Sequence, residues 1–241
     1  QQVSNAELYL KSKLTSEDIL SYGIENIVLA TGASWRSDAV GRVHRAPLKY
    51  LNSNRILTPD DVMAGKLSNE TSKGPIVIFD DDRFYMGSVL AEVAVKTDRK
   101  VIFITSTSSV SAWSENTLEQ NRIQSNLMNL EVEIIASHKL FNYQDKQLSI
   151  SCLFTEKISH IECETLILVT SRIPNDILWR ELSAKEDTWK DMGIETVTRI
   201  GDCLQPGLIA MAVQSGHRFV RAIEGKQEDL FKREDQNYPR N

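Results

Sequence analysis

The sequence predicts an α/β protein. Short apolar runs of four or five residues, typical of strands buried on both faces, recur along the 241 residues. Between them lie segments whose apolar residues follow helical spacing, and turn or capping residues separate the two kinds of segment. This alternation favours a sheet with helices packed on it over an all-helical or all-β chain.

Four elements are expected before residue 66. In chain order they are an exposed strand over Leu8–Leu14, a brief helix from Thr15 to Gly23, a buried strand over Ile27–Ala30, and, after a loop over 37–57, a helix over Thr58–Gly65. Thr15 and Asp18 have the spacing of a capping box, which begins a helix. The second helix is marked by Thr58 as its cap, Pro59 in its first turn and Gly65 at its end.

A second α/β unit is expected after the polar stretch Lys66–Gly74. Its predicted elements are strands over Ile76–Phe79, Val101–Thr105, Val132–Ile135 and Leu166–Val169, helices over about 86–95 and 116–130, and an antiparallel hairpin over about 147–155 and 157–163. The end of the chain predicts a strand over Thr196–Ile200, a helix from Gly207 through Glu224, and a charged, solvated tail over 225–241.

The composition excludes several classes of function. A net charge of -5, from 28 basic and 33 acidic residues, argues against a nucleic-acid binder, and no apolar run approaches the roughly 20 residues that span a bilayer. Cys152, Cys163 and Cys203 form no C-x-x-C pair, and the four histidines lack ligand spacing, so we expect no disulfide framework and no metal site. Thiols in a reducing cytoplasm are the simpler interpretation. The Gln-Gln start predicts that the chain is cut from a longer polypeptide.

Two glycine-containing strand ends suggest a nucleotide site. Gly201-Asp202 follows a predicted strand, at the sheet edge where open α/β folds bind ligands. Gly201 would let the backbone approach a ligand, Asp202 would accept hydrogen bonds from sugar hydroxyls, and Gly207 would open a helix whose N-terminus favours a phosphate. The alternative is an ordinary tight turn.

The other strand end is Ala-Thr-Gly-x-x-x-Arg at 30–36. Thr31 and Gly32 would line the same ligand, and Trp35 and Arg36 would cover it or pair with an anionic group. For Arg36 the alternative, a surface arginine, stays equally open.

The second unit carries the frame of a nucleotide domain without its cofactor motif. A dinucleotide fold requires Gly-x-Gly-x-x-Gly between its first strand and helix, because side chains there collide with the pyrophosphate. Here the segment reads Asp80-Asp81-Asp82-Arg83-Phe84-Tyr85-Met86-Gly87. Only the glycine that packs helix against strand remains, and three aspartates repel a diphosphate. This unit is therefore expected not to bind NAD(P)H.

Six blocks of the sequence resemble the C-terminal part of the trimethylamine dehydrogenase family, which includes the dimethylamine and histamine dehydrogenases and related N-demethylases. The blocks are Ile27–Arg36 (IVLATGASWR), Leu57–Lys66 (LTPDDVMAGK), Asp80–Glu92, Asn116–Gln120 (NTLEQ), Leu166–Arg172 (LILVTSR) and Arg199–Arg221. The likeness runs from about residue 6 to residue 225.

The resemblance implies two Rossmann-like domains of the glutathione-reductase type. The first is a discontinuous FAD/ADP-binding-like domain over residues 1–73 and 171–241 that lacks its initial βαβ unit. The second is an inserted NAD(P)-binding-like domain over residues 74–170 without a working glycine motif. By position, Thr31, Gly32, Gly201, Asp202 and Gly207 match the family's ADP site, and Trp35 and Arg36 accompany them.

The resemblance also implies where the chemistry occurs. Family members carry FMN and a four-iron cluster on an N-terminal (β/α)8 barrel, oxidise the amine there, and pass electrons to an electron-transferring flavoprotein. This chain is then non-catalytic, with the missing barrel as its partner and with scaffolding, adenine-nucleotide binding and contact between copies as its expected roles. ADP, or the adenosine half of FAD, is the expected cofactor, bound weakly if the chain stands alone.

Two alternatives remain open. One is the corresponding part of an NAD(P)H-dependent flavin oxidoreductase resembling dienoyl-CoA reductase, against which the missing glycines at 82 and 84 argue. The other is a non-enzymatic interaction module that has lost cofactor binding.

Overall fold

The computed structural model describes residues 5–48, 55–69 and 72–223. The chain forms two compact units, one of residues 1–33 and 174–241 and the other of residues 34–173. Both contain parallel strands with helices, so the predicted α/β class is confirmed. Strands β2 (Ala33–Trp35) and β11 (Arg172–Pro174) are hydrogen-bonded neighbours in the two segments where the chain passes between the units.

The larger unit is built on a five-stranded parallel sheet of order β3-β10-β4-β5-β6. Its strands are β3 (Ile56–Leu57), β4 (Ile76–Asp80), β5 (Val101–Thr105), β6 (Glu133–Ile135) and β10 (Thr165–Val169). The three central strands are buried along their whole length. This explains why they read as uninterrupted apolar runs rather than as alternating patterns.

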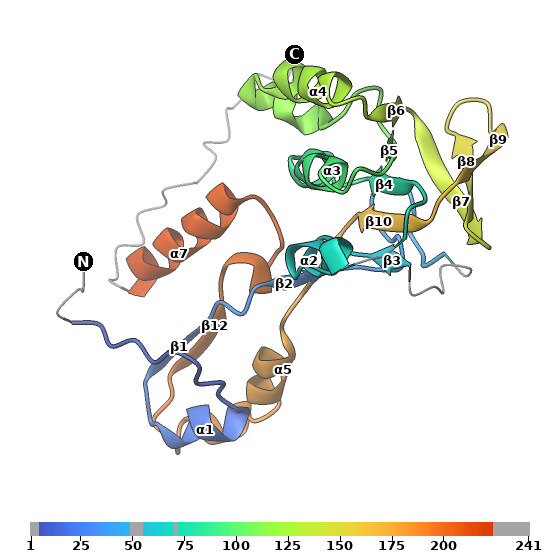
Figure 1. Cartoon of the computed structure of the whole chain (residues 1–241). Coiled ribbons are helices and arrows are strands. Elements are labelled where there is room, and N and C mark those ends of the chain that lie inside the picture. The colour runs from blue at the N-terminus through green and yellow to red at the C-terminus, as the bar shows by residue number, and fades with distance from the viewer. Residues whose placement is uncertain (1–4, 49–54, 70–71, 224–241) are drawn as a thin grey trace, which may run out of the picture. The chain divides into compact units, whose positions relative to one another are not determined.

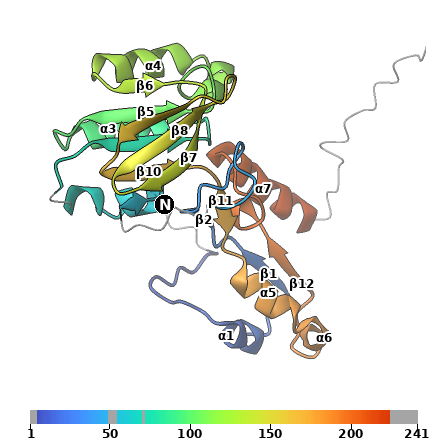
Figure 2. The same ribbon diagram turned by 90° about the vertical axis from the view of Figure 1, so that its right-hand side faces the viewer.

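Helices cover one face of this sheet and a second sheet covers the other (Figures 1 and 2). On the helical side, Ile76 and Ile78 share a core with Leu90 of α3 and Leu127 of α4. The helical elements are α2 (Pro59–Met63), η1 (Leu67–Asn69), α3 (Met86–Val95), η2 (Ala112–Thr117) and α4 (Gln120–Asn129).

The opposite face packs against the antiparallel sheet of β7 (His138–Gln144), β8 (Gln147–Cys152) and β9 (Ile158–Glu162). There Val77 and Phe79 share a second core with Leu140 of β7 and Leu148 of β8. Successive residues of β4 thus point to opposite faces, as strand geometry requires.

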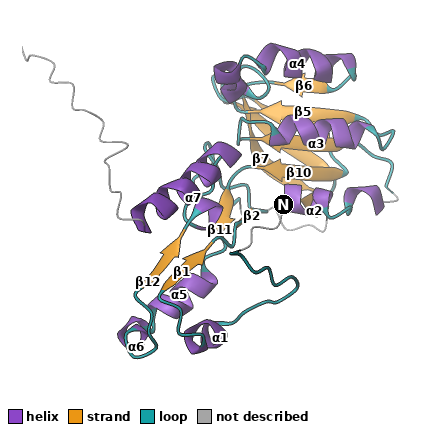
Figure 3. Ribbon diagram, turned by 90° about the vertical axis from the view of Figure 1, so that its left-hand side faces the viewer, coloured by secondary structure: helices purple, strands orange, loops and turns teal. Residues whose placement is uncertain are grey.

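The smaller unit contains a two-stranded parallel sheet, several short helical segments and the longer helix α7 (Figure 3). Its elements are α1 (Ser16–Ser21), β1 (Asn26–Leu29), α5 (Ile177–Ser183), α6 (Glu186–Trp189), β12 (Thr196–Arg199), η3 (Gly201–Cys203) and α7 (Ile209–Ile223). Its core includes Ile19 of α1, Leu29 of β1, Leu182 of α5 and the Cys203 side chain.

The two compact units divide the chain at other residues than the expected domains do. Residues 34–73 and 171–173, which the expectation places in the first domain, lie in the larger unit. The physical reason is that β3 pairs in parallel with β10, while Val62 and Leu67 are buried in the core beneath α3. Which of the two units corresponds to which cofactor domain stays a prediction.

The local predictions succeed where a capping signal or a buried run marks the element. The capping boxes at Thr15 and Thr58 are both present, and the predicted hairpin is β8–β9. The strand over Leu8–Leu14 is wrong: those residues form no strand and pair with no described strand, so the ladder hydrogen bonds that define one are missing. The predicted helix over 116–130 is divided into η2 and α4. The tail over 225–241 lies outside the described residues.

Candidate functional site

The carboxyl ends of β1 and β12 bring two predicted site segments to one sheet edge in the smaller unit. Leu29 pairs with Arg199 at the end of this parallel ladder, and the Ile200 amide donates to the Leu29 carbonyl at 3.0 Å. Thr31-Gly32 follows the first strand and Gly201-Asp202 follows the second. The arrangement places these loops where open α/β sheets bind ligands.

A cluster of Thr31, Asn175 and Cys203 joins the loops at this edge. The Thr31 hydroxyl donates to the Asn175 carbonyl at 2.5 Å and lies 3.0 Å from the buried Cys203 sulfur. Asn175 in turn donates its backbone amide to the Gly32 carbonyl at 2.9 Å and its side-chain amide to the Thr31 carbonyl at 3.2 Å. The sequence around Cys203 does not indicate this role, and the signal for Asn175 is its place after Pro174, the last residue of β11.

Gly32 and Gly201 both occupy the left-handed backbone region, with φ of +74° and +60°. A Cβ added at Gly32 would meet no atom within 4 Å, and one at Gly201 would lie 3.7 Å from the Ala212 Cβ. The glycines are therefore required by backbone conformation rather than by crowding within the chain. The side of Gly32 on which a Cβ would stand is open, as a ligand approaching the backbone requires.

Asp202 organises the turn that precedes α7. Its Oδ1 accepts the Gly207 backbone N–H at 3.0 Å, and the Ser215 hydroxyl of α7 accepts the Gly201 N–H at 3.0 Å. The helix begins at Ile209, so Gly207 lies two residues before it, and the Gly207 N–H donates to Asp202. Asp202 thus holds the turn before α7, a structural role that its sequence pattern does not indicate.

The other two predicted site residues, Trp35 and Arg36, belong to the larger unit. The Trp35 backbone N–H donates to the Asp60 carboxylate at 2.9 Å, and the Arg172 guanidinium stacks over the Trp35 ring at 5.0 Å from its centroid. Arg36 forms a two-point ion pair with Asp38, with Nε at 2.9 Å from Oδ1. This pairing raises the pKa of Arg36, so an anionic ligand would have to compete with Asp38.

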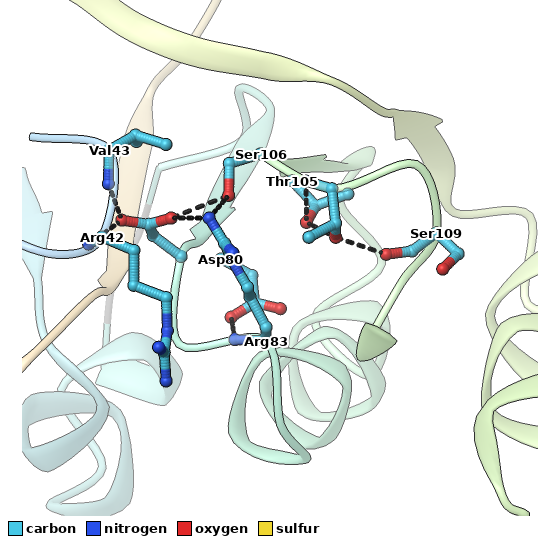
Figure 4. Close-up of polar contacts among 9 residues, drawn as sticks. Arg42, Val43, Asp80, Arg83, Thr105, Ser106 and Ser109 are labelled. Atoms are coloured by element: carbon cyan, nitrogen blue, oxygen red, sulfur yellow. Dashed lines mark hydrogen bonds and ion pairs between the residues drawn. The ribbon is translucent and has the colours of Figure 1, made fainter. Parts of the chain in front are cut away.

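In the larger unit, the edge that would hold a dinucleotide is filled by acidic and polar side chains (Figure 4). Asp80 is the last residue of β4 and Asp81 follows it, both fully buried, and Ser106 follows β5. Burial raises the pKa of Asp80 to about 8, so this carboxyl is largely neutral at pH 7. Its Oδ1 accepts the Arg83 backbone N–H at 3.0 Å.

The retained glycine of this segment has the packing role predicted for it. A Cβ on Gly87 would stand 2.8 Å from the Asp80 Cγ and 3.1 Å from the Phe103 ring. Only glycine lets α3 approach β4 this closely, which confirms the prediction that Gly87 packs helix against strand.

The described part of the chain contains no group of three or more His, Cys, Asp or Glu side chains arranged to hold a metal ion. Within the same ranges, no helix combines the length and apolar character needed to cross a bilayer.

Comparison with known proteins identifies related enzymes. Residues 57–169 match the family described as the OYE-like second alpha/beta domain. Dimethylamine dehydrogenase of Hyphomicrobium sp. (strain x) is 30% identical over 252 aligned residues, which cover 95% of this chain and 34% of that protein.

Solved structures agree with this relationship. Histamine dehydrogenase from Rhizobium sp. 4-9 superposes with a TM-score of 0.90 at 39% identity, over 96% of this chain and 35% of its own. The 6-hydroxypseudooxynicotine amine oxidase from Pseudomonas geniculata N1 gives a TM-score of 0.83 at 30% identity, over 89% of this chain and 31% of its own. At 16% identity and a TM-score of 0.66, 2-naphthoyl-CoA reductase shares the fold.

The chain spans about a third of the length of the relatives that it matches. Over that span, both sequence and structure follow the amine dehydrogenases. The chain is thus homologous to part of dimethylamine dehydrogenase and histamine dehydrogenase, and belongs with the trimethylamine dehydrogenase family.

Proposed function

We propose that this chain is the C-terminal, nucleotide-binding-like region of an FMN and iron–sulfur amine dehydrogenase or N-demethylase. The observation that carries the proposal is the 39% identity to histamine dehydrogenase over 96% of the chain. In this proposal the amine is oxidised on an N-terminal barrel, and electrons leave to an electron-transferring flavoprotein. The chain itself is non-catalytic and supports that assembly in the cytoplasm.

The smaller unit is the proposed adenine-nucleotide region, as the FAD/ADP-binding-like domain of a glutathione-reductase-type pair. Two features of its sheet edge fit an ADP moiety: Gly32 leaves open space beside the backbone, and the Asp202 carboxylate stands after the neighbouring strand. One expected part is lacking, because residues 1–33 contain no Gly-x-Gly-x-x-Gly cradle for the diphosphate. We therefore expect the isolated chain to bind ADP weakly or not at all.

When ADP is bound, it would supply no chemistry, since it has no redox-active group. The chain's own residues have structural roles at this site. Asn175, Thr31 and Cys203 hold the two strand-end loops together, and Asp202 holds the turn before α7. A nucleotide at this edge would thus stiffen the packing of β1, β12 and α7 rather than take part in catalysis.

The larger unit is proposed as the NAD(P)-binding-like domain of the pair, one that no longer binds a cofactor. The side chains of Asp80 and Asp81 fill the place where a dinucleotide fold has its glycine-rich turn, and the Asp81 carboxylate also repels a diphosphate. This is also the argument against an NAD(P)H-dependent flavin reductase.

The proposal is tested by what co-purifies with the protein. Acid release followed by mass spectrometry of the longer polypeptide that contains this sequence should yield ADP, AMP or FAD as well as FMN. The Asp202→Ala variant should lose the adenine nucleotide and keep FMN, with the exposed Asp187→Ala on α6 as the matched control. An adenine nucleotide that persists in Asp202→Ala removes this residue from the site, and its absence from the wild type supports the interaction-module alternative.

A further inference from the structure

The Asp81 carboxylate is bound by four donors from three separate segments. Its Oδ2 accepts the backbone N–H groups of Arg42 and Val43, the latter at 2.8 Å. Its Oδ1 accepts the Ser106 hydroxyl at 2.7 Å, and the Arg83 Nη2 lies 3.4 Å away. The Asp81 side chain is fully buried, so these donors replace its hydration completely.

The donor set is that of an oxyanion site. Two consecutive backbone N–H groups form an anion-binding nest, and a hydroxyl with a guanidinium completes the coordination that phosphates and carboxylates receive in proteins. Arg83 is itself fixed in place, since its Nη2 also donates to the Ser106 oxygen at 3.1 Å and its backbone takes a positive φ of +72°. Figure 4 shows the backbone nitrogens of Arg42 and Val43 facing this region, where Ser106 and Arg83 from two other segments also lie, while the Arg42 side chain points away from it.

Arg42 and Val43 belong to the loop of residues 38–48, which makes further contacts at the same sheet edge. Residues 38–48 contain the fully buried Ala39, and the Ser171 hydroxyl, which follows β10, donates to the Val40 carbonyl at 2.6 Å. Gly41 passes so close to the carboxylate that an added Cβ would stand 2.6 Å from the Asp81 Oδ2. The loop is thus shaped around the anion.

We infer that Arg42, Val43, Ser106 and Arg83 form an oxyanion-binding site that is occupied by the chain's own Asp81 carboxylate, which seats residues 38–48 as a strap at the carboxyl ends of β4 and β10. A ligand anion and the Asp81 carboxylate cannot occupy the site at the same time. The edge at which open α/β sheets bind phosphates is therefore closed from within. A small free carboxylate should enter only when the Asp81 side chain is removed.

Amide hydrogen exchange with chemical rescue tests this inference. In Asp81→Ala, measured in chloride, the Arg42 and Val43 amides should exchange about ten-fold faster or more than in the wild type, because both lose a charged acceptor. Formate at the same ionic strength should restore most of that protection. Asp82→Ala, which removes the neighbouring carboxylate, should show neither the loss nor the rescue.

The inference would be overturned if the Arg42 and Val43 amides of Asp81→Ala exchanged at the wild-type rate. It would also be overturned if they exchanged as fast in formate as in chloride. If Asp81→Ala does not fold in chloride, the yield of refolded protein is compared between the two salts instead. The yield should be higher in formate than in chloride at the same ionic strength.

A second variant tests the same contact from the other side. Gly41→Ala should accelerate exchange of the Arg42 and Val43 amides in the wild-type background, because its Cβ collides with Asp81. In the Asp81→Ala background the same substitution should have a smaller effect, because only the contact of the added Cβ with the Thr170 Cβ, at 3.2 Å, remains. Equal effects in both backgrounds would contradict the proposed contact, since independent sites give additive effects.

Discussion

The hydroxyl of Thr31 lies 3.0 Å from the sulfur of Cys203, although the two residues are 172 positions apart in the chain. Each follows one strand of the parallel pair β1–β12, and both contact the carbonyl oxygen of Asn175. Three segments are thereby held at one sheet edge. The candidate nucleotide site depends on this junction, because its two glycine-containing loops start there.

Removing the Thr31 hydroxyl tests that junction. We expect Thr31→Val to lower the free energy of unfolding by about 1 kcal/mol, the usual contribution of one neutral hydrogen bond. Thr31→Ser keeps the hydroxyl and should stay within about 0.5 kcal/mol of the wild type. Urea denaturation measures both, and equal losses in the two variants would show that the hydroxyl is not what matters.

The buried Asp80 predicts an unusual pH dependence of stability. Its pKa is raised from 3.8 to about 8 by burial, so between these pH values the folded state retains a proton that the unfolded state releases. The unfolding free energy should therefore fall as pH rises from about 4 to about 8, with a contribution of up to roughly 1.4 kcal/mol per pH unit.

Asp80→Asn should remove that contribution, because an amide does not ionise. The variant should be more stable than the wild type at pH 7, by up to about 4 kcal/mol, with the difference shrinking toward pH 4. The exposed Asp187→Asn serves as the control. A wild-type pH profile that Asp80→Asn leaves unchanged would show that the carboxyl ionises normally.

Alanine substitutions at Gly87 and Gly216 should change the free energy of unfolding in opposite directions. Gly87→Ala places a Cβ 2.9 Å from the Asp80 Cβ and 3.1 Å from Phe103, so overpacking should destabilise the chain by roughly 1–3 kcal/mol. Gly216 lies within α7 with no atom within 4 Å of an added Cβ. Gly216→Ala should therefore stabilise the chain by about 0.5–1 kcal/mol through helix propensity. Thermal or urea denaturation of the pair settles the comparison.

The cysteines should differ sharply in reactivity. Hydrogen bonds from Thr155 and Phe154 lower the pKa of the Cys152 thiol, whereas burial raises the pKa of Cys163 to about 12. Because the thiolate is the nucleophile, iodoacetamide at neutral pH should modify Cys152 first and leave Cys163 intact. Peptide mass spectrometry over a time course reports the order. Early modification of Cys163 in the folded chain would contradict the burial of its side chain after β9.

Much of the fold is predictable because its signals are local. Buried runs such as Leu166–Val169 and the capping box of Thr58 with Asp61 each specify their element without reference to the rest of the chain. The strand over Leu8–Leu14 failed because a strand exists only with a partner, which its own residues do not reveal.

The site was less accessible to sequence reasoning, for a related reason. Gly32 and Gly201 are recognisable because each follows a strand, but the donors to Asp81 come from Arg42 and Val43, 39 and 38 residues away. A backbone N–H has no side-chain signature, so no pattern in the sequence could have indicated those contacts. The contact of Cys203 with Thr31 arises only when β1 and β12 pair, so the sequence around Cys203 does not indicate it.

Anaerobic stopped-flow reduction of the flavin tests the proposed function most directly, because it shows which electron donor reduces the protein. If this chain is the C-terminal region of an amine dehydrogenase, as proposed, the flavin of that full-length protein should be reduced by an amine among trimethylamine, dimethylamine and histamine, and not by NADPH or NADH. The isolated chain should oxidise none of them. Reduction by NADPH or NADH with no response to any of these amines would contradict the account.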